Sequence, residues 1–158
     1  MSAGCLFTDG KSVLCGLQKH GDRMVLSGFG GKIEEGESST HCAIREMLEE
    51  LFHFENVPET LINDIFVSYI PGQFIKNGDY SIMVYTFWEL EDFLTMTKFS
   101  GCSSPLYDHM PTNITDLILK RKFCADAEIQ ALGLLPLSED EYTISKAFLS
   151  DLKLLRPK

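Results

Sequence analysis

Three glutamates in one short segment could carry chemistry together. Glu46, Glu49 and Glu50 lie within Thr40–Phe52, where apolar residues recur at helical spacing. On a helix the three carboxylates fall within an arc of about 100°, beside the apolar stripe. A run of charge usually faces water, so a solvated acidic face is one interpretation. The other is a site for Mg²⁺ or Mn²⁺, which bind carboxylate oxygens and substrate phosphates.

The segment ahead of this helix favours the metal site. Five residues separate Gly31 from Glu37, and seven separate Glu37 from the pair Arg45-Glu46. An apolar residue, any residue and the pair Glu49-Glu50 follow. This pattern resembles the Nudix box, in which a glycine, a glutamate, an arginine-glutamate pair and two further glutamates stand at these spacings. Matches across two fixed gaps make the resemblance much more specific than a lone glycine motif.

The pattern departs from the Nudix box at its end. Phe52 stands where the box has a glycine, and His53 stands where it has an apolar residue. A glycine there would adopt a positive φ at the helix C-terminus. Phe52 adopts that conformation reluctantly. We therefore expect the helix to end differently in this chain, near Asn56.

The resemblance implies a role for each matching residue. Glu37 and Arg45 would form an ion pair that ties the loop to the helix. In this family a further glutamate often comes from a later loop or strand. Glu128 is the candidate and Asp126 the second choice, although an ordinary carboxylate at a strand edge explains Glu128 equally well. The implied metal ligands all offer oxygen donors, one of them through its backbone carbonyl: Gly30, Glu46, Glu49, Glu50 and Glu128.

The implied reaction is hydrolysis of a pyrophosphate bond in a nucleoside-diphosphate-linked substrate. Bound Mg²⁺ neutralises the phosphate oxygens and lowers the pKa of a water. A glutamate then orients or deprotonates that water. Glu49 or Glu50 is the favoured base and Glu128 the alternative. The residues assigned to catalysis all lie in the segment that resembles the Nudix box: Glu37, Arg45, Glu49 and Glu50.

The segment Leu26–Glu37 looks most like the MutT-like enzymes, which hydrolyse nucleoside triphosphates to a monophosphate and pyrophosphate. A (deoxy)nucleoside triphosphate is therefore the leading substrate. Ser27 stands where the oxidised-purine enzymes carry an asparagine that contacts the base, and Ser138–Glu141 is only a loose substitute for their later acidic motif. The expected substrate contacts all lie in or next to the glycine-rich loop: Ser27, Phe29, Gly31 and Lys32.

Two alternatives use the same fold. The stretch 91–126 is longer than a minimal member needs and contains the basic run Lys120–Lys122. Such an insertion could set specificity, and a basic patch could hold RNA phosphates in an mRNA-decapping hydrolase. A solvated basic helix end explains the run more simply. A non-catalytic nucleotide-binding Nudix module is the third possibility, but such domains usually lose the box glutamates, which this chain retains.

The length, charge and cysteine content of the whole chain limit what else we expect of the protein. With 158 residues and no linker it predicts a single domain, 1–158. Its net charge of −9 argues against general attraction to nucleic acid. The five cysteines have no zinc-finger spacing, which favours reduced thiols in the cytoplasm, or alternatively in the nucleus. No apolar run is long enough to predict a membrane span.

The order of elements predicts an α/β fold, an α/β/α sandwich with a mixed sheet. Asp9-Gly10 predicts a hairpin turn, and Ser38, Ser39 and Thr40 are candidate caps of the central helix. The expected strands are 3–8, 12–17, 65–70, 80–88 and 128–135, with 65–70 and 80–88 paired antiparallel. The expected helices are 40–52, 113–123 and 138–155, while 89–99 is ambiguous.

Overall fold

The computed structural model describes residues 1–137 and 146–155, so Ser138–Glu141 and the first part of the expected helix 138–155 lie outside the described residues. The elements follow one another as β1 (Ser2–Thr8), β2 (Ser12–His20), β3 (Arg23–Ser27), β4 (Phe29–Lys32), α1 (Ser39–Phe52), α2 (Glu59–Ser68), β5 (Gln73–Asn77), β6 (Tyr80–Thr86), α3 (Phe87–Phe99), α4 (Ile114–Leu119), β7 (Ile129–Pro136) and α5 (Lys146–Leu155).

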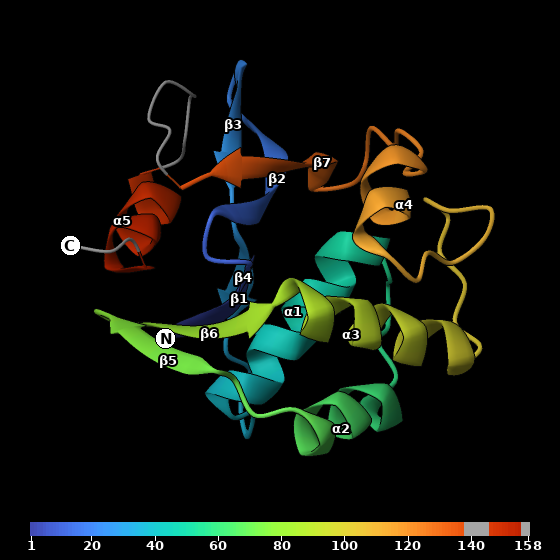
Figure 1. Ribbon diagram of the computed structural model, residues 1–158, viewed down its shortest axis with the longest axis horizontal. Coiled ribbons are helices and arrows are strands. Elements are labelled where there is room, and N and C mark those ends of the chain that lie inside the picture. The colour runs from blue at the N-terminus through green and yellow to red at the C-terminus, as the bar shows by residue number, and fades with distance from the viewer. Residues whose placement is uncertain (138–145, 156–158) are drawn as a thin grey trace.

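Strand β1 is the centre of a mixed sheet (Figure 1). It runs parallel to β6 and antiparallel to β2 and β4. The main path is β3-β2-β1-β6-β5, with β4 paired to β1 and β7 paired to β2. Because β4 pairs with β1 through Gly4 and Gly30, the glycine-rich loop is fixed to the central strand.

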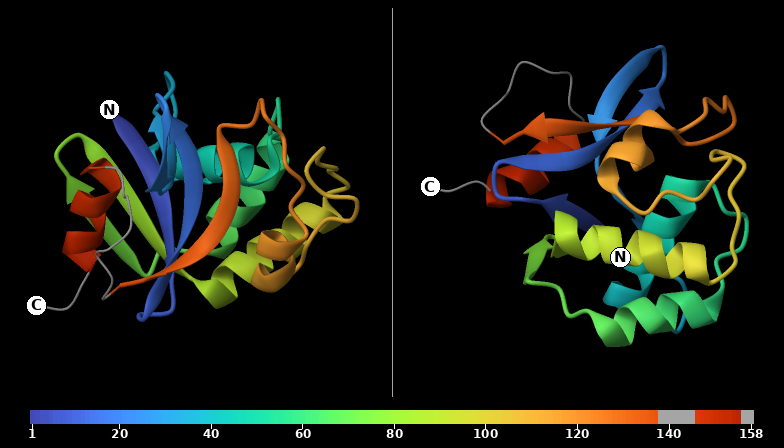
Figure 2. Two further views of the ribbon diagram at one scale, coloured as in Figure 1. Left: turned by 90° about the horizontal axis from the view of Figure 1, so that it is seen from above. Right: turned by 45° about the vertical axis from the view of Figure 1, so that its right-hand side comes forward.

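Helices cover both faces of this sheet, as Figure 2 shows. The larger core lies between the sheet and α1, with α2 and α3 completing it, and contains Phe7, Met47 and Phe93. The smaller core lies on the other face and includes Phe148 and Leu152 of α5. The α/β/α sandwich with a mixed sheet predicted from the sequence is therefore confirmed.

Local signals predicted the first hairpin and the start of α1. β1 and β2 pair antiparallel at Thr8 and Val13, and Gly10 has a φ of 88°. The Asp9 side chain accepts hydrogen bonds from the backbone of the turn. At the start of α1 the Ser38 hydroxyl accepts a hydrogen bond from the N–H of His41, which is the expected cap.

The strand predicted at 65–70 is wrong. Residues 65–68 belong to α2, where Leu61, Ile62 and Ile65 are buried at helical spacing. The partner of β6 is β5, and the two join at Gly78, whose φ is 65°. The sequence predicted an antiparallel partner for β6 but placed it too early in the chain, because a short run of β-branched and aromatic residues fits either a strand or a helix until packing selects one.

Two later boundaries also differ from the prediction. The strand expected to reach residue 88 ends at Thr86, where a capping box with Glu89 starts α3. Phe87 and Trp88 therefore lie on a helix. The helix expected at 113–123 covers only 114–119, so the basic run Lys120–Lys122 follows α4 rather than ending inside it.

The end of α1 corrects the expectation of a later exit. The helix ends at Phe52, and the left-handed residue is His53, with a φ of 55°. Phe52 is fully buried, and its ring contacts those of Phe54 and Tyr107 at centroid distances of 5.3 Å and 5.9 Å. The position of the box glycine has thus become part of the core, and the left-handed turn has moved one residue along.

This arrangement predicts opposite effects for two glycine substitutions. Phe52→Gly should lower the free energy of unfolding by about 3–5 kcal/mol, because it removes a buried aromatic ring. His53→Gly should leave it unchanged or raise it by up to about 1 kcal/mol, because glycine adopts the left-handed conformation without cost. Urea unfolding of both variants measures this. A stable Phe52→Gly protein would contradict the assignment.

Candidate active site

The glutamates of α1 stand directly above the glycine-rich strand. A Cβ at Gly31 would overlap the carboxylate of Glu46, so β4 passes as close to the helix as a backbone can. The Gly30 N–H donates a hydrogen bond of 3.2 Å to Oε1 of Glu50. The approach of Glu46 excludes a side chain at Gly31, and at Gly30 a Cβ would overlap the Tyr80 hydroxyl and the Ala3 carbonyl, so both positions require glycine.

One cavity of about 200 Å³ gathers the carboxylates. It is lined by residues from α1 and from the segment before β7: Glu46, Glu49, Glu50, His53, Phe54, Asp126 and Glu128. Glu128 also accepts a 2.9 Å hydrogen bond from Gln18 of β2. The structure therefore brings both later carboxylates that the sequence singled out, Glu128 and Asp126, to the glutamates of α1.

Glu50 is the most perturbed carboxyl group of this cavity. Burial, followed by the charge of Glu128, raises its pKa to about 9, and Glu46 and Glu49 contribute further. Burial also raises the pKa of Glu46. The protein therefore supplies too little positive charge to balance the carboxylates of this cavity. As a result Glu50 keeps its proton at neutral pH.

Arg45 is the cation that offsets part of this charge. It binds Glu37 through Nε at 2.7 Å and through its second terminal nitrogen at 3.0 Å. Its other terminal nitrogen contacts Glu46 at 3.0 Å and Glu49 at 3.1 Å. The ion pair expected between loop and helix is present, and the same guanidinium reaches two carboxylates of the cavity.

His41 extends this network and was not singled out in the sequence. Its ring nitrogens lie 3.0 Å from Glu37 and 2.9 Å from Glu59. Burial alone would lower the pKa of His41, but the two carboxylates outweigh it and raise that pKa. The one-turn spacing of Glu37 and His41 was a signal for their contact, whereas the contact with Glu59 of α2 depends on tertiary packing.

The donor set of the cavity fits a hard divalent cation. Its ligands are carboxylate oxygens, and the raised pKa of Glu50 marks a place where positive charge is lacking. Among the described residues, no three His, Cys, Asp or Glu side chains already stand at ligating distances from a common point. Instead Glu46 and Glu49 are bound to Arg45, and Glu50 is bound to Gly30.

The expected substrate contacts separate in the structure. Ser27 is buried, its hydroxyl has no partner among the described residues, and it lines a second cavity of about 330 Å³. Gly30 lines the same cavity. Lys32 is exposed, and Gly31 faces Glu46. The expectation that Phe29 contacts the substrate is corrected. This residue is 1% exposed and its ring packs against Phe7, so it belongs to the core.

Other residues of the second cavity come from distant parts of the chain. Gln18, Asn77, Tyr80 and Asp151 contribute polar atoms to it. Asn77 donates a 2.9 Å hydrogen bond to the buried Asp151 of α5, and burial raises the pKa of that carboxyl. None of these residues belongs to a motif, so sequence patterns gave no signal for them.

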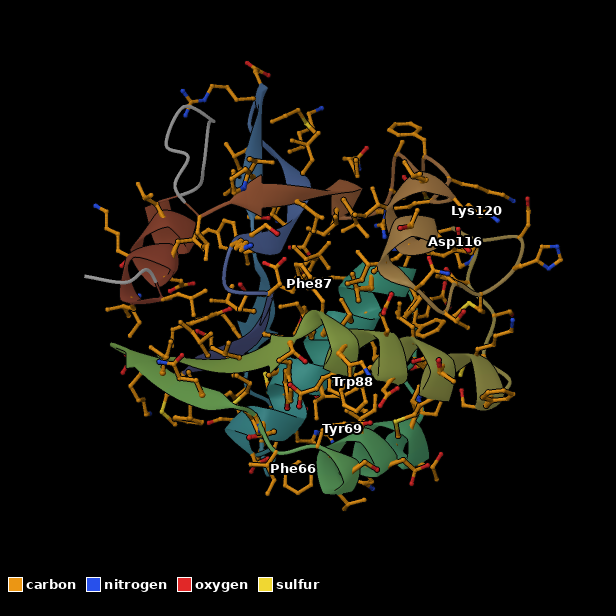
Figure 3. The ribbon with its side chains drawn as sticks, viewed as in Figure 1. Phe66, Tyr69, Phe87, Trp88, Asp116 and Lys120 are labelled. Atoms are coloured by element: carbon orange, nitrogen blue, oxygen red, sulfur yellow. The ribbon has the colours of Figure 1, made fainter. Side chains whose placement is uncertain are left out.

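The basic run Lys120–Lys122 is largely engaged within the protein. Lys120, which follows α4, lies 3.8 Å from Asp116 of that helix, and Figure 3 labels both side chains. Lys122 pairs with Asp108. Arg121 points inward and donates to backbone carbonyls. These contacts remove the main reason for an RNA-binding patch.

Comparison with known proteins agrees with this geometry. The sequence model of the NUDIX domain matches residues 1–97, which is more than half of the chain. The chain belongs to the Nudix family. Hydrolases of this family use divalent metal cations. No curated protein matches this Nudix chain significantly in sequence.

Solved structures share its fold at low sequence identity. A bifunctional NMN adenylyltransferase/ADP ribose pyrophosphatase from Francisella tularensis, complexed with AMP and a Mn ion, superposes with a TM-score of 0.52. It is 11% identical and aligns with 98% of this chain, which spans 40% of its length.

Two further structures align with 96% of the chain. One is a MutT NUDIX hydrolase from Burkholderia pseudomallei (14% identity, 94% of that chain, TM-score 0.46). The other is a C. elegans Ap4A hydrolase (12%, 92%, 0.45). Within the described Nudix residues, no helix has the length and apolarity to cross a bilayer.

Glu37 predicts a defined dependence of stability on pH. Burial alone would raise its pKa, but hydrogen bonds from Arg45 and the Glu34 N–H lower it from 4.5 to about 2. Its ionised form therefore stabilises the fold above pH 4.5, and this stabilisation disappears as the pH falls toward 2. Glu37→Gln should lower the free energy of unfolding by about 1–3 kcal/mol at pH 7.

The measurement is urea unfolding at a series of pH values, with Glu35→Gln as the control because Glu35 is exposed. The difference between wild type and Glu37→Gln should shrink below pH 4.5, whereas Glu35→Gln should differ little at any pH. A Glu37→Gln difference that stays constant down to pH 2.5 would rule out the linkage.

Proposed function

We propose that this chain hydrolyses (deoxy)nucleoside triphosphates to the monophosphate and pyrophosphate in a Mg²⁺-dependent reaction. The observation that carries the proposal is the carboxylate cavity: Glu128 and Asp126 meet Glu46, Glu49 and Glu50 around a buried carboxyl group whose pKa is raised to about 9. A cavity that concentrates this much negative charge repels a bare polyphosphate. It suits a polyphosphate that arrives with Mg²⁺.

The residues in and beside the cavity have different proposed roles. Glu46, Glu49, Glu50 and Glu128 would hold Mg²⁺, with the Gly30 backbone beside them. Once bound, Mg²⁺ would neutralise the phosphate oxygens and make water a better nucleophile. Arg45 holds Glu46 and Glu49 beside Glu37, which keeps these carboxylates near their working positions. Glu50 is the favoured base, because bound Mg²⁺ would offset the neighbouring carboxylates and leave its buried carboxyl group ionised and able to accept a proton from water.

The second cavity supports a nucleoside-containing substrate. Gly30 lines it and also contacts Glu50, so the two cavities meet at one residue. The cavity offers the buried Ser27 hydroxyl, which has no partner within residues 1–137 and 146–155, the Asn77–Asp151 pair and the hydroxyl of Tyr80. A buried hydroxyl without a partner costs free energy that a hydrogen-bonding ligand recovers. A base and sugar provide such groups.

The substrate prediction is tested by incubating the full chain with Mg²⁺ and a panel of compounds. The panel contains NTPs, dNTPs, oxidised dGTP, ADP-ribose, dinucleoside polyphosphates and cap-labelled RNA. We expect pyrophosphate release from the triphosphates, abolished by EDTA and restored by Mg²⁺ or Mn²⁺. Product from capped RNA alone, or from ADP-ribose alone, would contradict the substrate proposal while leaving the hydrolase chemistry in place.

The role of Glu50 is tested by Glu50→Gln, with Glu35→Gln as the exposed control. We expect kcat to fall by about 10²–10⁴-fold in Glu50→Gln, since a general base contributes this much. The protein should stay folded, because the amide is isosteric and its oxygen can still accept from Gly30. Because the raised pKa leaves Glu50 uncharged at neutral pH, the neutral amide should leave the unfolding midpoint nearly unchanged. Near-wild-type turnover in Glu50→Gln would refute the assignment.

A further inference from the structure

The last turn of α1 is capped by side chains from far along the chain. A helix leaves its final carbonyls without intrahelical partners, and a glycine-based turn often satisfies them. This chain has Phe52 at the glycine position of the Nudix box. The Ser104 hydroxyl donates to the Phe52 carbonyl, and Arg121 donates to the carbonyls of Leu51 at 2.6 Å and Glu50 at 3.3 Å. The segment between α3 and β7 therefore replaces the missing glycine cap.

Arg121 makes a third contact that links two parts of the cavity. The terminal nitrogen that reaches Glu50 also donates to the carbonyl of Ile129 at 2.8 Å. Ile129 directly follows Glu128 in the chain. One planar guanidinium thus joins the backbone of Glu50 to the backbone next to Glu128. Figure 1 shows α4 and the start of β7 beside the C-terminal end of α1.

Comparison with the neighbouring lysines shows that the link to α1 is specific to Arg121 and does not follow from positive charge alone. Lys120 and Lys122 are mostly exposed, and both pair with aspartates of their own segment. Neither contact reaches α1. A guanidinium can donate to several carbonyls in a fixed plane, whereas an ammonium group acts as a point charge. Removing Lys122 therefore removes the same charge from the same segment without cutting the link to α1.

We propose that Arg121 is a positioning residue that sets the spacing between the glutamates of α1 and Glu128. It would act through the backbone and touch neither substrate nor cation. The inference rests on the proposed function, because it assigns Glu50 and Glu128 to one cation. Groups that orient metal ligands from outside the ligand shell typically change metal affinity or activity by about 10–100-fold when they are removed.

The test compares Arg121→Lys and Arg121→Ala with Lys122→Ala as the matched control. Binding of Mn²⁺ alone is measured from the electron paramagnetic resonance signal of free Mn²⁺, and thermal unfolding is followed in parallel. Arg121→Lys retains a positive charge near the helix end and should remain folded. We expect its Mn²⁺ affinity to fall by about 10-fold or more, and that of Lys122→Ala to change less than about twofold.

Steady-state kinetics supply a second readout. In Arg121→Lys, kcat should fall by about 10-fold or more while the KM for the nucleotide changes less than about threefold, because the second cavity is not among the contacts of Arg121. In Arg121→Ala, added guanidinium ion at low millimolar concentration should restore part of the Mn²⁺ affinity. Unchanged Mn²⁺ affinity in folded Arg121→Lys, or loss of thermal stability alone, would overturn the proposal.

The two proposals fail in different ways. If wild type binds Mn²⁺ in an Arg121-dependent manner but hydrolyses no nucleotide, the positioning role stands and the proposed substrate is wrong. If wild type hydrolyses nucleotides and Arg121→Lys does so with unchanged kcat and Mn²⁺ affinity, the proposed function stands and the positioning role is wrong. No binding of Mn²⁺ by wild type would overturn the positioning role outright.

Discussion

Repulsion among carboxylates is the constraint on which this structure depends. Glu46, Glu49 and Glu50 lie on one face of α1, and Asp126 and Glu128 approach from the segment before β7. Like charges at helical spacing disfavour the helix by a few tenths of a kcal/mol per pair, and burial adds to that cost. A chain selected only for stability would avoid this arrangement. Under the proposed function, a bound cation would offset this charge.

The protein itself offsets part of this charge. Arg45 binds Glu37, Glu46 and Glu49 at once, and Glu50 accepts from the Gly30 N–H. Arg45 in turn is held by Glu37, which His41 also contacts. Arg45 therefore has two effects. It ties the loop to the helix, and it limits the repulsion among the carboxylates of the cavity.

The stretch 91–126 gains a structural meaning from the same constraint. From the sequence alone, this stretch was interpreted as an insertion that sets specificity or contacts RNA. In the structure its Tyr107 packs on Phe52, while Ser104 and Arg121 bind the last carbonyls of α1. The stretch thus secures the end of the helix that carries Glu50. The loss of the box glycine and the length of this stretch are explained together.

The sequence by itself determined the features that depend on neighbours along the chain. The first hairpin followed from Asp9-Gly10, the start of α1 from Ser38, and the resemblance to the Nudix box from the fixed gaps between Gly31, Glu37 and Arg45. Each is a local property of turn, cap or helix geometry. The alternation of strands and helices also predicted the α/β/α sandwich, because apolar faces must be covered on both sides of such a sheet.

Tertiary structure alone decided which distant groups meet. The segment 65–68 continues α2, whose Leu61, Ile62 and Ile65 pack into the larger core at helical spacing, and local propensity cannot report this packing. Asn77 and Asp151 meet across 74 positions, and Arg121 reaches Leu51 across 70. No spacing encodes such contacts, since hydrogen bonds between distant residues depend on how the layers stack. The family could therefore be predicted from the sequence, while the shape of the candidate site and the contacts that support it came only from the fold.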